Sequence, residues 1–176
     1  MKQIFESENI RFIEVSEALT EDYLVMVNDM ENVERYLGGA HEPFTAEDER
    51  RWVREKLAEK APVFSMIEKK TGAFIGNIEL MDVKDSVGEL GIALTARMQD
   101  RGYGTEAVSA LTAYAFERMG LERIVLRTDP ANTRAIRVYE KCLFREVERR
   151  DGRVFMELSR EARAQSSALR NCAEMA

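Results

Sequence analysis

The sequence predicts an α+β domain built on a mixed, mostly antiparallel sheet, and three observations support this fold class. Strand-like runs follow one another in the middle of the chain with only short turns between them, as in an antiparallel meander. One strand-helix-strand passage in the second half requires a single parallel crossover. A closing Asp-Gly hairpin follows, and the repeated strand-helix-strand units of a doubly wound sheet are missing.

Local patterns place the elements along the chain. Alternating apolar residues indicate strands, whereas apolar residues at helical spacing indicate helices. Thr45 with Asp48 three residues later forms an acidic version of the capping box, and Asn132 after Pro130 is a second helix cap. In chain order we predict a strand over 10–15, a helix over 20–36 that ends at Gly38-Gly39, a helix over 46–60, strands over 63–68, 73–83 and 87–94, a helix over 105–119, a strand over 123–128, a helix from 133 to about 142, and strands over 145–150 and 153–158.

The length of 176 residues suits one domain. We expect that domain to span residues 1–158, because the composition changes after Leu158. Residues 159–176 are rich in Ala, Ser, Arg and Gln, which predicts an extra helix or a frayed tail.

Composition and charge exclude several function classes. The chain has 26 Lys and Arg against 32 Asp and Glu, a net charge of −6, so its overall field repels nucleic acid and anionic membrane surfaces. Its apolar runs are too short to span a membrane, and its N-terminus is acidic, so we expect a cytoplasmic protein. Two cysteines and one histidine cannot build a zinc cage or a disulfide framework, so no metal is expected. We expect Cys142 to be a packed thiol and His41 to lie in a surface loop.

A glycine loop that runs directly into a helix is the most informative segment. Residues 99–105 read Gln-Asp-Arg-Gly-Tyr-Gly-Thr, and such a loop offers unpaired backbone N–H groups to an anion such as phosphate. No lysine follows the second glycine, which excludes a Walker A loop. Gly102, Gly104 and Ala107 satisfy the dinucleotide fingerprint, but residues 95–101 separate them from the preceding strand. A plain helix start is the remaining alternative.

Two segments together resemble the GNAT superfamily of acyl-CoA-dependent N-acetyltransferases. The loop 99–104 fits the family's [Gln/Arg]-x-x-Gly-x-[Gly/Ala] signature and follows a strand that ends in Gly-Ile-Ala-Leu. The second signature, an Asn followed by Ala and then Tyr-Glu-Lys, is found over residues 132–141. The resemblance covers about residues 10–158 and is closest to the branch of ribosomal-protein, spermidine and small-amine acetyltransferases. It implies a GNAT-type fold with splayed central strands and about four flanking helices, and acetyl-CoA as co-substrate.

The resemblance also implies the site residues. Tyr139 is the donor to the departing thiolate, and Glu89 is the base that takes a proton from the amine. Glu79 on the neighbouring strand is a second candidate base. As alternatives, both carboxylates are polar strand residues, and Tyr139 is a core aromatic. Pyrophosphate is expected on the loop and the pantetheine amides on the strand edge, so the cofactor-binding residues are Ile92, Ala93, Leu94, Gln99, Arg101, Gly102, Tyr103, Gly104, Thr105 and Asn132.

Two departures from the family pattern leave an alternative function open. Leu143 stands where the family usually has a C-cap glycine, which predicts a strained left-handed residue. Arg127 stands where some protein N-terminal acetylases carry a glutamate base. A catalytically silent acyl-CoA-binding regulatory module is therefore the alternative to an N-acetyltransferase.

The acceptor is less well defined by the sequence. Residues 31–52 combine acidic and aromatic side chains, which suits a cationic amine but equally suits a solvated helix face. We expect the acceptor to be a small-molecule amine or a protein N-terminus, and a homodimer is a possible assembly.

Overall fold

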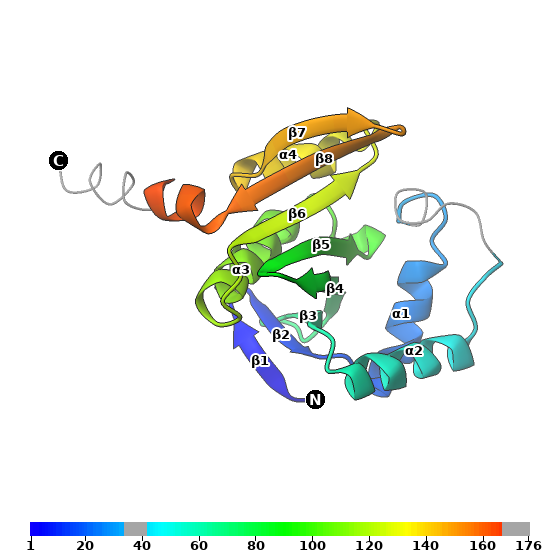
Figure 1. Cartoon of the computed structure of the whole chain (residues 1–176). Helices are drawn as coiled ribbons and strands as arrows, with labels where there is room; N and C mark the ends of the chain where they lie inside the picture. The colour runs from blue at the N-terminus through cyan, green and yellow to red at the C-terminus, as the bar shows by residue number, and fades with distance from the viewer. Residues whose placement is uncertain (34–41, 167–176) are drawn as a thin grey trace.

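The computed structural model describes residues 1–33 and 42–166, which form an eight-stranded mixed sheet with helices on both faces (Figure 1). The strands are β1 (Gln3–Glu6), β2 (Ile10–Glu14), β3 (Val63–Glu68), β4 (Phe74–Lys84), β5 (Val87–Leu94), β6 (Arg123–Thr128), β7 (Arg145–Arg150) and β8 (Arg153–Ser159). The helices are α1 (Thr20–Val27), α2 (Ala46–Glu59), α3 (Tyr103–Glu117) and α4 (Thr133–Lys141), with 3₁₀ turns η1 (Glu17–Leu19) and η3 (Ala96–Met98).

The sheet order is β1-β2-β3-β4-β5-β6-β8-β7, and β5 and β6 form its parallel pair. The neighbouring strands on either side pair antiparallel, so the predicted mixed sheet with one parallel crossover is confirmed. The bounds predicted for β3, β5 and β6 agree with the structure. The capping box at the start of α2 is also confirmed, because Thr45 and Asp48 bond reciprocally.

In the N-terminal region one prediction is wrong, and one strand was not predicted. The helix predicted over 20–36 ends at Val27, and its last positions lie outside the described residues, as do Gly38-Gly39 and His41. The helix ends early because the Asn28 side chain bonds both backbone groups of Phe44, while Asp29 accepts from the backbone N–H of Asn32. Sequence reasoning also missed the short edge strand β1, which pairs with β2.

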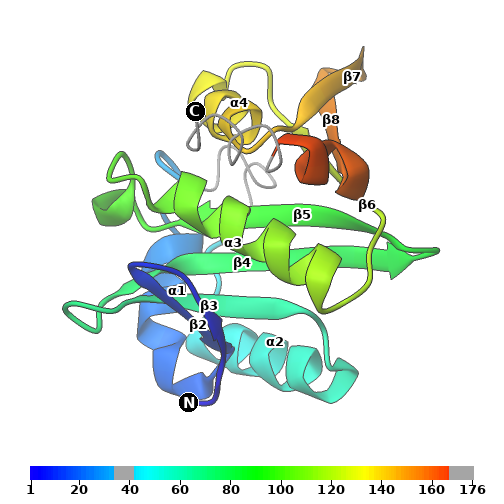
Figure 2. The ribbon, with the colours of Figure 1, turned by 90° about the vertical axis from the view of Figure 1, so that its left-hand side faces the viewer.

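The two faces of the sheet are covered by different helices (Figure 2). The larger core lies under α3 and α4, where Leu111, Ile124 and Met156 are buried. The smaller core lies under α1 and α2, around Tyr23 and Val53. Side chains alternate along β5 and β6, so each strand contributes to both faces.

The chain beyond β8 continues as a helix over residues 160–166. The Arg160 guanidinium donates to the carbonyl oxygen of Leu121, and Arg163 donates to the Thr112 hydroxyl on α3. Within the two described segments, no helix has both the length and the apolar character needed to cross a bilayer.

Candidate active site

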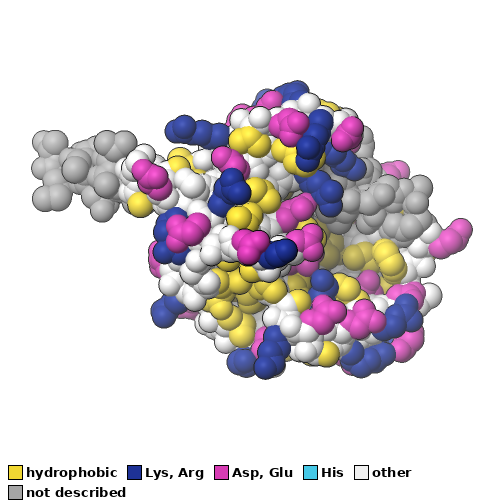
Figure 3. Space-filling model, in the orientation of Figure 1, with side chains coloured by type: hydrophobic (Ala, Val, Ile, Leu, Met, Phe, Trp, Pro, Cys, Tyr) yellow, Lys and Arg dark blue, Asp and Glu magenta, His cyan; other side chains and the backbone are white. Residues whose placement is uncertain are grey.

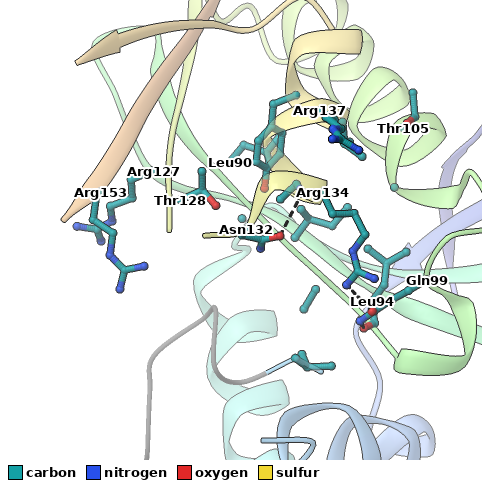
Figure 4. A pocket seen from close by; sticks show the side chains of 18 of the residues that line it. Leu90, Leu94, Gln99, Thr105, Arg127, Thr128, Asn132, Arg134, Arg137 and Arg153 are labelled. Carbon is teal, nitrogen blue, oxygen red and sulfur yellow. Dashed lines mark hydrogen bonds between the residues drawn. The ribbon is translucent and has the colours of Figure 1, made fainter. Parts of the chain in front are cut away.

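An opening between β5 and β6 forms the centre of the site. The two strands pair only from Val87 to Glu89 on β5, opposite Arg123 to Val125 on β6. Beyond this point β6 continues to pair with β8, while the rest of β5 pairs with β4 alone. A cavity of about 960 Å³ lies at this divergence, lined by β5, the loop 99–105, α4, β6 and β8 (Figure 4).

The glycine loop brings the start of α3 to the cavity. Gly102 has φ +87°, a left-handed conformation that an L side chain rarely adopts, although a Cβ there would meet nothing within 4 Å. It is the N-cap of α3 and offers no side-chain cap, so the N–H groups of the first turn remain available to a ligand. A Cβ on Gly104 would meet only Val138 of α4, at 3.8 Å. Gly102, Gly104 and Thr105 all line the cavity.

Gln99 joins the loop to three other parts of the site. Its Nε2 donates to the carbonyl oxygens of Leu94 at 3.1 Å and Asn32 at 3.2 Å. The Arg134 guanidinium, on the first turn of α4, donates to Gln99 Oε1 at 2.6 Å and to Asp100 Oδ2 at 2.9 Å. Gln99 therefore fixes the distance between the end of β5 and the start of α4.

The predicted cofactor residues Arg101 and Tyr103 direct their side chains elsewhere, since neither residue lines the cavity. The Tyr103 hydroxyl donates to Glu68 Oε1, the Thr71 hydroxyl donates to Glu68 Oε2, and Arg101 lies 3.6 Å from the same carboxylate. Glu68 is only 6% exposed, yet the hydrogen bonds from Thr71 and Tyr103 lower its pKa. This cluster, which sequence reasoning missed, ties the glycine loop to the β3–β4 turn.

Tyr139 lies on α4 and lines the cavity with 7% of its surface exposed. Burial raises the pKa of its phenol to about 12, with a smaller contribution from Cys142. The phenol is therefore neutral at physiological pH and can donate a hydrogen bond. Its hydroxyl makes no hydrogen bond to any residue of 1–33 or 42–166, whereas its ring packs against Phe144 at a centroid distance of 6.0 Å. Both predicted roles, donor and core aromatic, are compatible with this placement.

Cys142 is buried beside this helix, as expected for a packed thiol, and burial raises its pKa to about 11. The next residue, Leu143, has φ +72°, which confirms the predicted left-handed conformation. Asn132 caps α4 through Oδ1, which accepts from the backbone N–H of Ala135 at 3.2 Å, and Asn132 also lines the cavity. Its side chain can therefore serve both predicted roles.

The two candidate bases have different surroundings. Glu89 lines the cavity, and its Oε1 lies 3.0 Å from the Arg127 Nε on the neighbouring parallel strand. Glu79 does not line the cavity, and its carboxylate lies 3.6 Å from the Lys56 ammonium on α2. The geometry therefore favours Glu89, although Glu89 also forms the ion pair with an arginine that the sequence left open as an alternative.

The described part of the acidic and aromatic stretch predicted to shape the acceptor, residues 31–33 and 42–52, contributes little to the cavity. Of the residues described in 31–52, only Asn32 and Val33 line it. Glu47 and Asp48 instead pair with arginines on the exposed side of α2. Sequence reasoning missed the residues of the cavity wall on α4, β7 and β8, namely Arg134, Arg137, Lys141, Arg150, Arg153 and Phe155. The available signal was the cluster of basic residues around the Asp151-Gly152 turn, namely Arg149, Arg150 and Arg153.

Residues 1–33 and 42–166 bring together no three His, Cys, Asp or Glu side chains able to hold a metal ion. The groups that line the cavity include the Tyr139 phenol, the Glu89 carboxylate and several arginine guanidiniums.

Comparison with known proteins gives consistent results. Residues 9–145 match the family model described as the acetyltransferase (GNAT) domain. The chain is 30% identical over 99 residues to the uncharacterized N-acetyltransferase YnaD of Bacillus subtilis, covering 56% of this chain and 58% of that protein. It is 30% identical over 106 residues to the uncharacterized N-acetyltransferase p20 of Bacillus licheniformis, covering 56% of this chain and 60% of that protein. The matched region thus spans less than two thirds of either relative.

Solved structures share the fold. A GNAT-family acetyltransferase from Bacillus anthracis superposes with a TM-score of 0.78 at 23% identity, covering 89% of this chain and 98% of that one. A spermidine N-acetyltransferase from Vibrio cholerae, solved with CoA and spermine, superposes with a TM-score of 0.78 at 16% identity, covering 90% and 99%. With a family model matched over most of its length and both predicted signatures at one cavity, the chain belongs to the GNAT acetyltransferase family.

Proposed function

We propose that this protein is an N-acetyltransferase that uses acetyl-CoA and transfers the acetyl group to a primary amine. The observation that carries the proposal is the uncapped start of α3 beside the splayed edge of β5, with Tyr139 lining the same cavity. The family membership is independent support.

The residues present fit acetyl-CoA. Backbone N–H groups at Gly102 to Thr105 suit the pyrophosphate, and a Cβ at Gly104 would enter the space between α3 and α4. Arg137 and Lys141, one helical turn apart on α4, add positive charge to the same side of the cavity in an otherwise acidic chain. The unpaired edge of β5 from Leu90 to Leu94 suits the pantetheine amides.

The bound co-substrate supplies a thioester carbonyl for attack by the amine. An alkylammonium has a reference pKa of about 10.4, so the amine is protonated at neutral pH and must lose a proton before its nitrogen can attack. Glu89 is the proposed acceptor of that proton, directly or through water. The amide C–N bond forms as the C–S bond breaks, one proton of the ammonium ends on the sulfur, and the other is released to solvent. Tyr139, neutral at this pH, donates a hydrogen bond to the departing sulfur.

Purified protein mixed with acetyl-CoA and a panel of amines tests the proposal by release of free thiol. We expect amine-dependent thiol release, and Glu89→Gln should reduce it most near neutral pH, where free amine is scarce. Activity should recover as the pH approaches the pKa of the amine. Glu79→Gln is the matched control, because this strand carboxylate lies outside the cavity.

The silent acyl-CoA-binding module is separated by the same experiment. CoA binding without thiol release in the presence of any amine would favour that alternative. The Glu89–Arg127 ion pair supports it, because it engages the carboxylate proposed as the base. A Glu89→Gln variant with an unchanged pH profile would remove Glu89 from the mechanism.

A further inference from the structure

Three arginines lie on one face of the sheet at the edge of the cavity. Arg127 on β6 is opposite Phe155 on β8, and Arg150 on β7 is opposite Arg153 on β8. Opposed residues share a face, and so do residues two apart on one strand, so these four side chains lie together. Val154 between them is fully buried and points to the other face. We name this set, Arg127, Arg150, Arg153 and Phe155, the arginine face.

Acidic side chains balance the arginine face only in part: they are Glu89, Glu148 and Asp151, which lines the cavity at the β7–β8 turn. Arg127 uses its Nε toward Glu89, but a guanidinium has five N–H donors, so most remain for a ligand. Arg150 stacks over the Phe155 ring at 4.6 Å and pairs with Glu148 at 3.5 Å. Arg153, which is half-buried, forms no ion pair or hydrogen bond with any described residue. In Figure 3, several basic side chains, with acidic ones among them, lie over the β6–β8 part of the molecule.

The arginine face is separate from the basic residues suited to CoA. In Figure 4, Arg127 and Arg153 lie together at one end of the cavity, while Arg137 and Thr105 lie at the other, with Thr128, Leu90 and Asn132 between them. Arg134 is held by Gln99 and Asp100 on the Thr105 side. On the proposed function, the α4 residues take the phosphates of CoA, and the arginine face has no assigned ligand.

We propose that the arginine face binds an anionic group of the acceptor, so that the preferred acceptor is an amine that also carries a carboxylate or a phosphate. This inference rests on the proposed acetyl transfer. Arg127 and Arg153 take the anion, and Glu89, on the same face and paired with Arg127, lies where the ammonium must approach. A guanidinium fork matches both carboxylate and phosphate geometry. A polyamine, which carries only positive charge, is disfavoured at such a surface.

The test compares acceptors that differ in the anionic group, and kcat/KM is expressed per concentration of free amine because that group also shifts the pKa of the amine. L-amino acids are paired with their own amides, ethanolamine is paired with O-phosphoethanolamine, and spermidine is included; thiol release gives kcat/KM for each. We expect the anionic member of at least one pair to exceed its partner and spermidine, and the pair that responds identifies carboxylate or phosphate as the ligand. Equal or lower kcat/KM for every anionic member would overturn the proposal.

Substitutions of arginines test whether Arg153 binds the anionic group of the acceptor. Arg153→Gln should lower kcat/KM for the anionic acceptor by about 10-fold, as expected for loss of one charge-assisted hydrogen bond, and leave its uncharged partner unchanged. Arg153→Glu should reverse the preference toward spermidine. Arg149→Gln is the matched control, because Arg149 is opposite buried Val154 and pairs with Glu146 away from the cavity. An equal loss for charged and uncharged acceptors would reject Arg153 as the anion-binding residue.

A binding measurement separates this inference from the proposed function. Inorganic phosphate is titrated calorimetrically into protein saturated with CoA, so that the CoA phosphate sites are filled. We expect phosphate binding in the wild type and its loss in Arg153→Gln, with the Kd for CoA unchanged in both. This result would support the anion site even if no amine released thiol, which would contradict only the proposed transfer. If the CoA-saturated wild type does not bind phosphate, or if Arg153→Gln weakens CoA binding itself, the separate site is rejected.

Discussion

The two ends of the cavity are built in different ways. The end of the cavity proposed for CoA, which we call the cofactor end, is formed by the last residues of β5, the loop 99–105 and α4. It presents mainly backbone groups, whose positions follow from Gly102, Gln99 and the Asn132 cap. The arginine face presents side chains from three strands that meet only through sheet register. The groups at the backbone-built end are therefore set by short local motifs. At the arginine face, a single substitution changes a group that faces the cavity and leaves the backbone of the sheet unchanged.

The first prediction tests the backbone-built end directly and has the largest expected effect. Gly104→Val should abolish acetyl-CoA binding, because a branched side chain would fill the space between α3 and α4 that the ligand requires. Calorimetric titration with CoA measures the loss, and circular dichroism checks folding. Gly104→Ala is the graded control, since a lone Cβ meets Val138 at an ordinary 3.8 Å. A folded valine variant with unchanged Kd would place the phosphate site elsewhere.

The second prediction concerns the single side chain at the cofactor end that is proposed to act in the reaction. Tyr139→Phe should lower kcat by about 100-fold, as for loss of one donor to developing charge. A phenol with its pKa raised to about 12 stays protonated at every lower pH, so the deficit should be constant across the working pH range. Pre-steady-state thiol release against pH measures it. Wild-type turnover in the variant would leave Tyr139 as a core aromatic packed on Phe144.

The third prediction asks whether the cofactor end depends on support from outside the cavity. Glu68→Gln weakens the contacts that hold Tyr103 and Arg101, and we expect KM for acetyl-CoA to rise by about 10-fold with kcat nearly unchanged. Steady-state kinetics separate the two constants. Glu6→Gln is the control, because this carboxylate is exposed and pairs with Lys69 away from the loop. A fall in kcat at constant KM would contradict a positioning role.

The smallest expected effect concerns stability at the cofactor end. The Thr95 hydroxyl, just before η3, is buried and has no hydrogen-bond partner among the described residues. Thr95→Val should therefore raise the free energy of unfolding by about 1 kcal/mol without changing kcat. Urea denaturation measures it. Thr112→Val is the matched control and should destabilise, because that buried hydroxyl donates to the Ser109 carbonyl and accepts from Arg163. A destabilised Thr95→Val variant would imply an unseen partner for this hydroxyl.

Most of the sheet could be predicted because its strands are marked by local signals. The turns that flank β3, β4 and β5 are short and polar, and the Thr45–Asp48 capping box marks the start of α2. The helix predicted over 20–36 failed for a physical reason: Asn28 bonds to Phe44, sixteen residues later, and this tertiary contact overrides the helical pattern. A single sequence carries no local sign of such a contact.

The candidate site divides in the same way. That Gly102, Gly104, Asn132 and Tyr139 share one cavity could be predicted, because they belong to two signatures that are each local in sequence. The positions of Arg153 and Glu68 could not be predicted, because Arg153 is placed by the register of β7 and β8, and Glu68 by a contact with Tyr103, which is distant in sequence. The predicted side-chain roles of Arg101 and Tyr103 remain predictions, since these side chains contact Glu68 rather than the cavity.

The short parallel ladder between β5 and β6 also has a consequence for folding. Its three residue pairs join segments that are separated by the whole of α3, so this contact closes a long loop, whereas the antiparallel hairpins on either side are local. The cavity exists only where these two halves of the sheet meet. On the proposed function, affinity for CoA would therefore report whether the two halves of the sheet have docked.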